Sequence, residues 1–489
     1  MMSDPLRHFD AERGGATLED AVDLPVASLD WRNGIDRFAA HWRGRRIGVV
    51  GLARSGVAAC RLLHAMGCDV RISELKTTDA TRAQAQALRE AGVERIELGD
   101  HHREFFADCE AMIVSPGVPE SALPITWAEH DGVPILSEIE FAFRFCPSPI
   151  IAVTGTNGKS SVVTLIARVL TAAGKTAVTC GNIGIPFSSM IQTLTPESIV
   201  VLEVSSFQLL RCDRFRPEVG VLLNIGTNHL DRHPDFDSYA KAKARLFQSQ
   251  LPTDYAVLNA GDPAIRRVAS EIVSQPVWFG GAVDQNPARF RLAPATRELL
   301  ADNLQAVVQV GRVRQIGDPL IYQAIREFRG LEHRLEHVAT VSGVHIINDA
   351  KSTTPESSLY ALGRCPGPVV VILGGKDKGL DFSMLRPALA DPRVRGIVLI
   401  GQTRPALRAA LDGLPVQEAE SLDAALRVAM GCAASGETVL FSPACASFDM
   451  FTNFEERGRI FKTLVQQLQD QTKDHGPRTT DPCARSVDS

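Results

Sequence analysis

The 489-residue sequence lacks several features that would each assign it to a particular class of protein. Its ten cysteines never form a C-x-x-C pair, which excludes the usual zinc and redox spacings and indicates reduced, structural thiols. No stretch of about 18 apolar residues is present, and the charged amino-terminal segment has no apolar core of the kind found in signal peptides. We therefore expect a cytoplasmic protein that is not inserted in a membrane.

An excess of charge of one sign is also missing. The chain has 52 Lys and Arg against 57 Asp and Glu, a formal net charge of -5, and no run of like charges. Nucleic acid is therefore not an expected partner. The composition, 45% hydrophobic and 22% charged, is near the average for soluble proteins, and at roughly 100–200 residues per domain we expect about three domains.

Three stretches of the chain alternate short apolar strands with helical segments, and this pattern predicts parallel α/β sheets. The first begins with RIGVVGLARSG at Arg46, the second with IIAVTGTNGKSS at Ile150, and the third with HIINDA at His345. We predict an amino-terminal extension over residues 1–44, domains over 45–148, 149–336 and 337–469, and a disordered polar tail over 470–489.

The strongest local motif is the segment GTNGKS over residues 155–160, here called the phosphate loop. Glycines let backbone N–H groups approach phosphate oxygens, a helix N-terminus favours anions, Lys159 offsets their charge and Ser160 can bind Mg²⁺. The first glycine of the usual G-x-x-x-x-G-K pattern would stand at Val153, so the spacing is unusual. The alternative is a glycine-rich turn from strand to helix that binds no ligand. The segment favours a central domain of the P-loop ATPase type between two Rossmann-like domains.

Other polar residues follow predicted strands, at the edge of an α/β sheet that usually binds ligands. Glu203 follows SIVVL and His229 follows VGVLLNIGTN, so both are candidate metal ligands. Taken alone, either residue could equally be structural, and Lys243 on a predicted helix could be an ordinary solvated lysine.

A similar group opens the third stretch. Asp349 and Lys351 follow the strand HIIN and could position a nucleotide, or they could form a surface salt bridge. Arg334 could bind phosphate through two hydrogen bonds or be a surface arginine.

In this order, TGTNGKS, LEVSSFQL, NHLDRH, YAKAK, GLEHRLE, NDAKSTTP and SPACASFDMFTNFEERG resemble the motifs of the Mur ligase family over residues 45–468. The last segment, together with HLDRH, is most similar to the members that add D-glutamate. The resemblance implies an α/β ligase of three domains, Rossmann-like, P-loop-type and Rossmann-like, which bind the UDP-muramoyl substrate, ATP, and glutamate with nucleotide. ATP would phosphorylate the carboxylate of UDP-N-acetylmuramoyl-L-alanine, and the amine of glutamate would displace the phosphate.

Carried over position by position, the resemblance implies the following roles. ATP would contact Gly155, Thr156, Asn157, Gly158, Lys159, Ser160, Asn303, Arg334, Asp349 and Lys351. Two Mg²⁺ ions would be held by Ser160, Glu203, His229 and Lys243, the last as a carbamate, and Lys159, Glu203, His229 and Lys243 would be catalytic. The UDP substrate would contact Ser55, Glu74, Ser115, Gly117 and Asn182. Glutamate would contact Thr353, Lys378, Ser447 and Phe454, which supply a cation and hydroxyl donors for a dianion.

Three local departures from known patterns qualify this interpretation. The usual G-x-H-N-x-x-N stretch is RELLADN here, so Asn303 remains while Leu300 replaces an adenine-contacting asparagine. Thr227 and Asn228 precede His229 where an acidic residue is common, which alters the surroundings of a bound metal. GLARSG lacks the full dinucleotide glycine pattern, so NAD is not an expected cofactor.

Two alternatives stay open at this point. One is the same reaction with L-glutamate, and the other is a non-catalytic nucleotide-binding regulator of the same fold. We expect a monomer.

Overall fold

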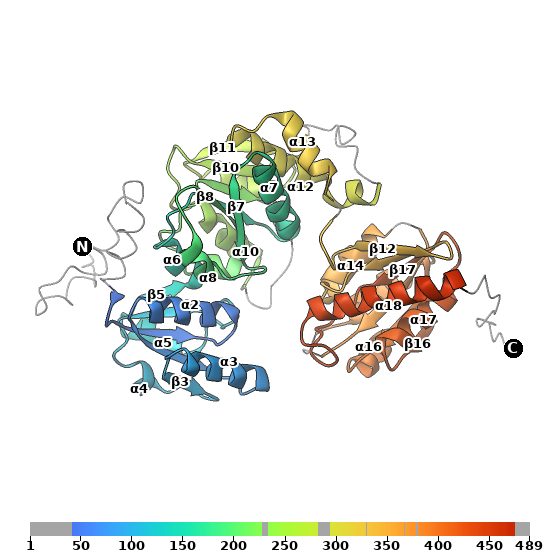
Figure 1. Ribbon diagram of the computed structural model, residues 1–489, viewed down its shortest axis with the longest axis horizontal. Coiled ribbons are helices and arrows are strands. Elements are labelled where there is room, and N and C mark those ends of the chain that lie inside the picture. Colours follow the sequence, from blue (N-terminus) through green and yellow to red (C-terminus); the bar gives the residue numbers. More distant parts are fainter. Residues whose placement is uncertain are drawn as a thin grey trace, which may run out of the picture. The chain divides into compact units, whose positions relative to one another are not determined.

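The computed structural model describes residues 42–226, 233–281, 294–328, 330–365, 367–377 and 380–474, with side chains between residues 294 and 301 and beyond 472 left aside (Figure 1). The chain divides into two compact units, one with residues up to 293 and 300–328, the other with 294–299 and the chain from 329 onward. His229 and Lys378 lie outside the described residues, as do Thr227 and Asn228.

The first unit contains two parallel sheets. The first sheet has the strand order β3-β2-β1-β4-β5. Its strands are β1 (Arg46–Val50), β2 (Asp69–Glu74), β3 (Arg95–Leu98), β4 (Ala111–Val114) and β5 (Ile135–Ser137). Its helices are α2 (Arg54–Ala65), α3 (Asp79–Glu90), α4 (Arg103–Phe106), α5 (Leu123–His130) and α6 (Glu138–Phe143). Central strand β4, and β1 after Arg46, have no polar side chains because helices cover both faces of a parallel sheet.

The second sheet has six parallel strands in the order β11-β10-β9-β6-β8-β7. Its strands are β6 (Ile150–Thr154), β7 (Thr176–Gly181), β8 (Ser198–Glu203), β9 (Val219–Leu222), β10 (Tyr255–Asn259) and β11 (Gln275–Phe279). Its helices are α7 (Lys159–Ala172), α8 (Phe187–Met190), α9 (Ser206–Leu209), α10 (Phe236–Ala244), α11 (Pro263–Ala269), α12 (Pro294–Val313) and α13 (Asp318–Arg326). From β6 the chain forms β7 and β8 on one side, and then β9 to β11 on the other. This reversal of strand order creates a crevice at the carboxyl end of β6, the usual ligand position in such sheets.

The second unit contains the third sheet, with the order β12-β13-β17-β14-β15-β16. Its strands are β12 (Glu336–Val341), β13 (Val344–Asn348), β14 (Val369–Gly374), β15 (Val394–Ile400), β16 (Val416–Glu418) and β17 (Thr438–Phe441). Its helices are α14 (Pro355–Arg364), α15 (Arg386–Leu389), α16 (Arg404–Ala410), α17 (Leu422–Cys432) and α18 (Phe454–Asp474). Helices α17 and α18 cover one face and α14 and α16 the other, each over its own apolar core (Figure 1).

The predicted α/β class with three doubly wound sheets is confirmed, with two local differences. Strand β12 was not predicted, and it pairs antiparallel with β13 at the edge of the third sheet. Helix α18 continues to Asp474, so the prediction of a disordered tail from residue 470 is wrong for residues 470–474. The polar sequence there suits the exposed end of a helix whose apolar side is packed further back, at Phe461 and Val465.

None of the helices in the described ranges is both long enough and apolar enough to cross a membrane. The cytoplasmic location, the monomeric state and the domain boundaries stay predictions.

Candidate active site

The phosphate loop lies in the crevice at the carboxyl end of β6 and leads into α7. Gly155 and Gly158 have φ angles of 154° and 87°, and Gly158 caps the N-terminus of α7. A Cβ atom at Gly158 would lie 2.4 Å from the Asn303 side-chain nitrogen, so α12 places Asn303 directly against the loop. The predicted residues 155–160 and Asn303 therefore come together at the N-terminus of α7, the end of a helix that favours an anion.

Two lysines point at the same carbonyl oxygen of this loop. Lys159 Nζ donates to the Gly155 carbonyl at 2.8 Å and to the Thr156 carbonyl at 3.1 Å, and Lys243 Nζ donates to the Gly155 carbonyl at 3.0 Å. Lys243 is only 1% exposed, so it is not a solvated surface lysine. Burial, and then the charge of Lys159, hold the pKa of Lys243 well below its usual range. Lys243 therefore has an amine that readily loses its proton, as a nucleophile requires.

Glu203 lies at the end of β8, opposite Val153 of β6 in the strand register. Its side chain is 2% exposed, and Oε1 accepts a hydrogen bond from Asn182 Nδ2 at 3.0 Å. Oε2 is buried and has no hydrogen-bond partner in the part of the chain that the structure describes. A buried carboxylate oxygen of this kind fits a cation, because an uncompensated charge is costly in the interior.

The metal candidates are thus partly assembled. Ser160 is buried in the first turn of α7, Lys243 contacts the phosphate loop, and Glu203 lies on the strand beside it. Within the described ranges, however, His, Cys, Asp and Glu form no cluster of three that could hold a metal ion. The donor set here would be a hydroxyl, a carboxylate and a modified lysine, a predominantly oxygen set that suits Mg²⁺.

Sequence reasoning missed the residues that brace the phosphate loop. Asn224, just after β9, accepts from Asn157 N at 2.8 Å and donates to the Asn157 carbonyl at 3.1 Å. Thr156 Oγ1 accepts from Gly226 N at 2.9 Å and lies 3.2 Å from the hydroxyl of Tyr239, whose ring lies beneath Lys243 Nζ. The position of Asn224 after an apolar strand was the available signal, while Tyr239 had none beyond its helix.

Most UDP-substrate candidates gather at the carboxyl edge of the first sheet, after the adjacent strands β2, β1 and β4. The Glu74 carboxylate accepts from Leu52 N and Lys76 N, both at 2.8 Å, and the Ser115 hydroxyl donates to the Gly51 carbonyl at 3.1 Å. Ser55 is half-buried in α2 and Gly117 is exposed. Asn182 is exposed beside Glu203 in the second sheet, so it lies with the metal candidates rather than with this group.

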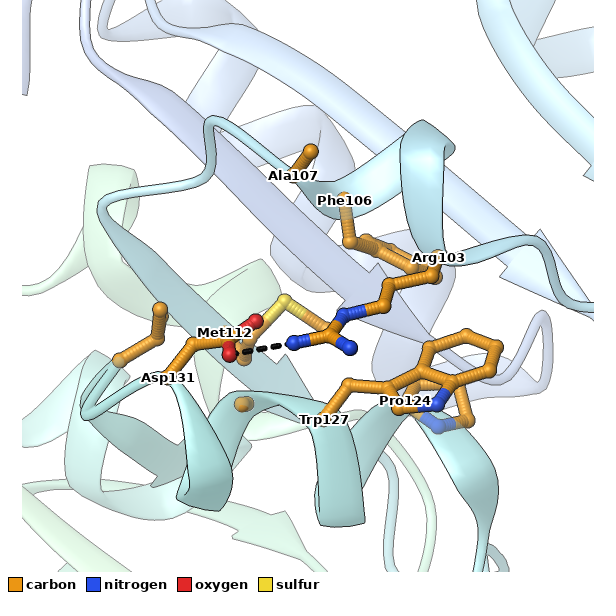
Figure 2. Close-up of a pocket in the computed structure, with 9 residues that line it drawn as sticks. Arg103, Phe106, Ala107, Met112, Pro124, Trp127 and Asp131 are labelled. Carbon is orange, nitrogen blue, oxygen red and sulfur yellow. Dashed lines mark hydrogen bonds and ion pairs between the residues drawn. The ribbon is translucent and has the colours of Figure 1, made fainter.

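A separate hollow in the first sheet's domain lies between α4 and α5 (Figure 2). Arg103 and Asp131 form an ion pair at its mouth, with Phe106, Met112 and Trp127 around them. Its volume of about 20 Å³ leaves little more room than one water molecule needs, and none of the predicted site residues lines it.

In the second unit, Arg334, Asp349 and Lys351 are held together by backbone contacts. Asp349 Oδ1 accepts from Leu335 N at 3.1 Å, and Lys351 N donates to the His333 carbonyl at 3.0 Å. His333 and Leu335, on either side of Arg334, have positive φ angles of 61° and 46°. Asp349 is 2% exposed, which excludes a surface salt bridge for its carboxylate.

The described glutamate candidates lie in loops at the carboxyl edge of the same sheet and at the start of α18. Thr353 is half-buried after β13, Ser447 is buried after the neighbouring strand β17, and Phe454 is half-buried as the first residue of α18. Lys376 N, close in sequence to Lys378, donates to the Ala446 carbonyl at 2.8 Å. Thr353 and Ser447 therefore lie on neighbouring loops. The loop that contains Lys376 is hydrogen-bonded to Ala446, the residue before Ser447.

Asp349 makes a testable contribution to the pH dependence of stability. Burial raises its pKa from 3.8 to about 6, so the folded state binds this proton more tightly than the unfolded state. The free energy of unfolding should therefore fall as pH rises from about 4 to about 6, by up to about 3 kcal/mol from this group. Urea unfolding of the wild type and Asp349→Asn should show that the wild type alone carries this slope; parallel pH profiles would contradict the assignment.

Models of three related domains match the chain. They are the Mur ligase MurD-like N-terminal domain over residues 45–137, the Mur ligase middle domain over 153–307, and the Mur ligase glutamate ligase domain over 333–445. The UDP-N-acetylmuramoylalanine--D-glutamate ligase of Koribacter versatilis is 38% identical in an alignment of length 451 that covers 88% of this chain and 99% of that protein. The chain belongs to the Mur ligase family.

Other Mur ligases show the same relationship. The enzyme of the same name from Salinibacter ruber is 39% identical and covers 87% of this chain and 98% of its own length. Among solved structures, the UDP-N-acetylmuramate-alanine ligase MurC of Thermotoga maritima aligns with a TM-score of 0.55 at 19% identity, over 86% of this chain and 99% of that one. The MurF ligase of Thermotoga maritima, solved in complex with ADP, aligns with a TM-score of 0.53 at 15% identity, over 88% and 97%. These two structures support the Mur ligase fold.

Proposed function

We propose that this chain is the ligase that joins D-glutamate to UDP-N-acetylmuramoyl-L-alanine with hydrolysis of ATP to ADP and phosphate, a step in peptidoglycan precursor synthesis. The observation that carries the proposal is near full-length identity of 34–39% to ligases that bear this name. The half-buried Lys159 at the phosphate loop supports it, because an enzyme that transfers a phosphoryl group must stabilise negative charge at this position.

The proposed reaction has two steps, and each group of residues binds one of its substrates. The substrate carboxylate attacks the γ-phosphorus of ATP, ADP leaves, and the resulting acyl phosphate is attacked by the amine of glutamate with release of phosphate. The phosphate loop and Lys159 hold the phosphates in line, and Arg334 and Lys351 are the cations proposed for the nucleotide in the second unit. Thr353, Ser447, Phe454 and Lys378 are proposed to orient glutamate, while Ser55, Glu74, Ser115, Gly117 and Asn182 are proposed for the UDP substrate.

Mg²⁺ would be held by Ser160, Glu203, His229 and the modified Lys243, and when bound it neutralises the charge that builds up on the transferred phosphoryl group. Glu203 supports this assignment through its buried, unpartnered oxygen among the described residues. Lys243 would serve as a ligand only after its uncharged amine has reacted with CO₂, which would form the N–C bond of a carbamate anion and release a proton to solvent.

The carbamate gives a direct prediction. Because burial lowers the pKa of Lys243, a larger share of its amine should be uncharged, and able to attack CO₂, than at an exposed lysine. Protein incubated with ¹³C-bicarbonate should show one carbamate carbon resonance that Lys243→Arg lacks. A resonance that survives in Lys243→Arg would assign the carbamate to another lysine.

Purified protein incubated with UDP-N-acetylmuramoyl-L-alanine, Mg²⁺ and ATP, and with D- or L-glutamate separately, tests the function itself. Phosphate release and product mass should both appear with D-glutamate alone. Product with L-glutamate alone would show that the proposed reaction is right but that the enantiomer assigned to the glutamate pocket is wrong. No product with either would leave a nucleotide-binding regulator of the same fold.

A further inference from the structure

Arg457, in the NFEERG segment at the start of α18, has the largest side chain among the fully buried residues. It is 1% exposed, yet its guanidinium donates only to backbone carbonyls in the hydrogen bonds seen: Nη1 to Cys445 at 3.0 Å and Nη2 to Ala350 at 2.8 Å. Nε is buried without a hydrogen-bond partner among the described residues. A buried charge held in this way is costly, so its retention calls for a specific role.

The two carbonyl groups belong to the two loops that carry the ligand candidates of the second unit. Ala350 lies between Asp349 and Lys351, the nucleotide candidates, and Cys445 lies two residues before Ser447, a glutamate candidate. These loops follow β13 and β17, which are adjacent in the sheet. One rigid, planar guanidinium therefore fixes the spacing between the two loops.

A third loop packs against the same group. A Cβ atom at Gly375, just after β14, would lie 3.2 Å from Arg457 Nη1 and 2.2 Å from the Ala446 carbonyl oxygen. The glycine thus allows this loop, which leads toward Lys378, to approach both the guanidinium and the loop of Ser447. Arg457 lies beneath the loops of three neighbouring strands, in the order β13-β17-β14.

The guanidinium of Arg457 also places a positive charge beneath these three loops. Burial lowers its pKa to about 10, so the guanidinium is still protonated at neutral pH. Asp349 and Asp449 are the carboxylates whose charges act on it. A fixed positive charge beneath these loops favours anionic ligands above them, and both glutamate and a nucleotide are anions.

We infer that Arg457 is a positioning residue that sets the nucleotide-side loop and the glutamate-side loop at one working distance, so that a single side chain governs the binding of both ligands. This inference rests on the proposed function. It assigns no contact between Arg457 and either ligand.

Arg457→Lys and Arg457→Met test it. Lysine keeps the charge but cannot donate to both carbonyls in the same fork, and methionine removes the charge with a side chain of similar length, a change that buried sites often tolerate. We expect KM for glutamate and KM for ATP to rise together, at least about fivefold in Arg457→Lys and further in Arg457→Met, while KM for the UDP substrate stays within about twofold.

Arg393→Lys is the matched control. Arg393 also donates to two carbonyls in this unit, those of Cys365 and Leu362 at 3.2 and 3.1 Å, but at the far end of α14. Its substitution should leave all three KM values unchanged.

Each outcome bears on a different claim. Lower thermal stability with unchanged KM values in the Arg457 variants would reduce Arg457 to a structural role, and a rise in only one of the two KM values would refute the shared positioning. A wild-type protein that makes no product would remove the proposed function instead.

Discussion

Lys243→Met is expected to abolish ligation while leaving the fold at least as stable as the wild type. Removing the amine at the Gly155 carbonyl removes the proposed carbamate, and losing one group that acts on the charge of the reacting centre costs about 10²–10³ in rate. Stability should not fall, because the site is 1% exposed and an apolar side chain of similar volume suits it better than an ammonium group. Steady-state phosphate release and urea unfolding in CO₂-free buffer measure the two effects.

The pH dependence of the unfolding free energy distinguishes the effect of the buried Lys243 amine from a simple loss of packing. Since the folded state lowers the pKa of Lys243, the wild-type unfolding free energy should rise as pH rises toward 10.5, and the advantage of Lys243→Met should shrink accordingly. Lys241→Met is the control, because Lys241 lies exposed on the same helix α10. Its activity should be unchanged. A Lys243→Met enzyme with normal turnover would refute the role of this residue.

Gly458→Ala is expected to weaken nucleotide binding by at least tenfold, although alanine normally favours a helix. A Cβ atom at Gly458 in α18 would lie 2.3 Å from Nδ1 of the His333 ring, which is buried and hydrogen-bonded to Asn348 at 2.9 Å. His333 directly precedes Arg334, and its carbonyl accepts from Lys351 N, so a shift of the His333 backbone away from the added methyl group would also move these candidates. Such overpacking costs about 1–3 kcal/mol.

Gly363→Ala provides the comparison. Gly363 lies in α14, where an added Cβ atom meets nothing within 4 Å, so the substitution should stabilise the fold by up to about 1 kcal/mol. In Gly458→Ala, the additional substitution His333→Ala should recover stability because it removes the clash, but not nucleotide affinity. Calorimetric titration with Mg-ATP and thermal unfolding test both expectations. Equal affinity in Gly458→Ala and the wild type would show that the loop accommodates the methyl group.

The three sheets could be predicted because strands buried on both faces leave long apolar runs, as in VVVILG of β14. Strand β12 was missed because it lies at an edge, pairs antiparallel and has a single fully buried residue, Val341, so EHVATV gives a weak signal.

In the candidate site, too, local features could be predicted from the sequence and long-range contacts could not. Glu203 and Lys159 could be predicted because a strand end and a glycine turn are local features. The contacts of Asn224 and Arg457 could not, although Asn224 follows an apolar strand, since their partners Asn157 and Ala350 are 67 and 107 residues away and only folding brings them together. The loss of an adenine contact at Leu300, where the family usually has an asparagine, stays a prediction.

The central position of β6 determines when the phosphate loop can form during synthesis. Its bracing residue Asn224 follows Asn157 by 67 residues, and β9 must pair with β6 before the two asparagines meet. At roughly 5–20 residues per second, the ribosome needs several seconds to deliver that segment. Until β8 and β9 have been made, the edges of the apolar strand β6 have no partner strands, and such edges promote aggregation. The strand order that places the phosphate loop at the carboxyl end of β6 therefore makes the nascent chain dependent on delayed, long-range pairing.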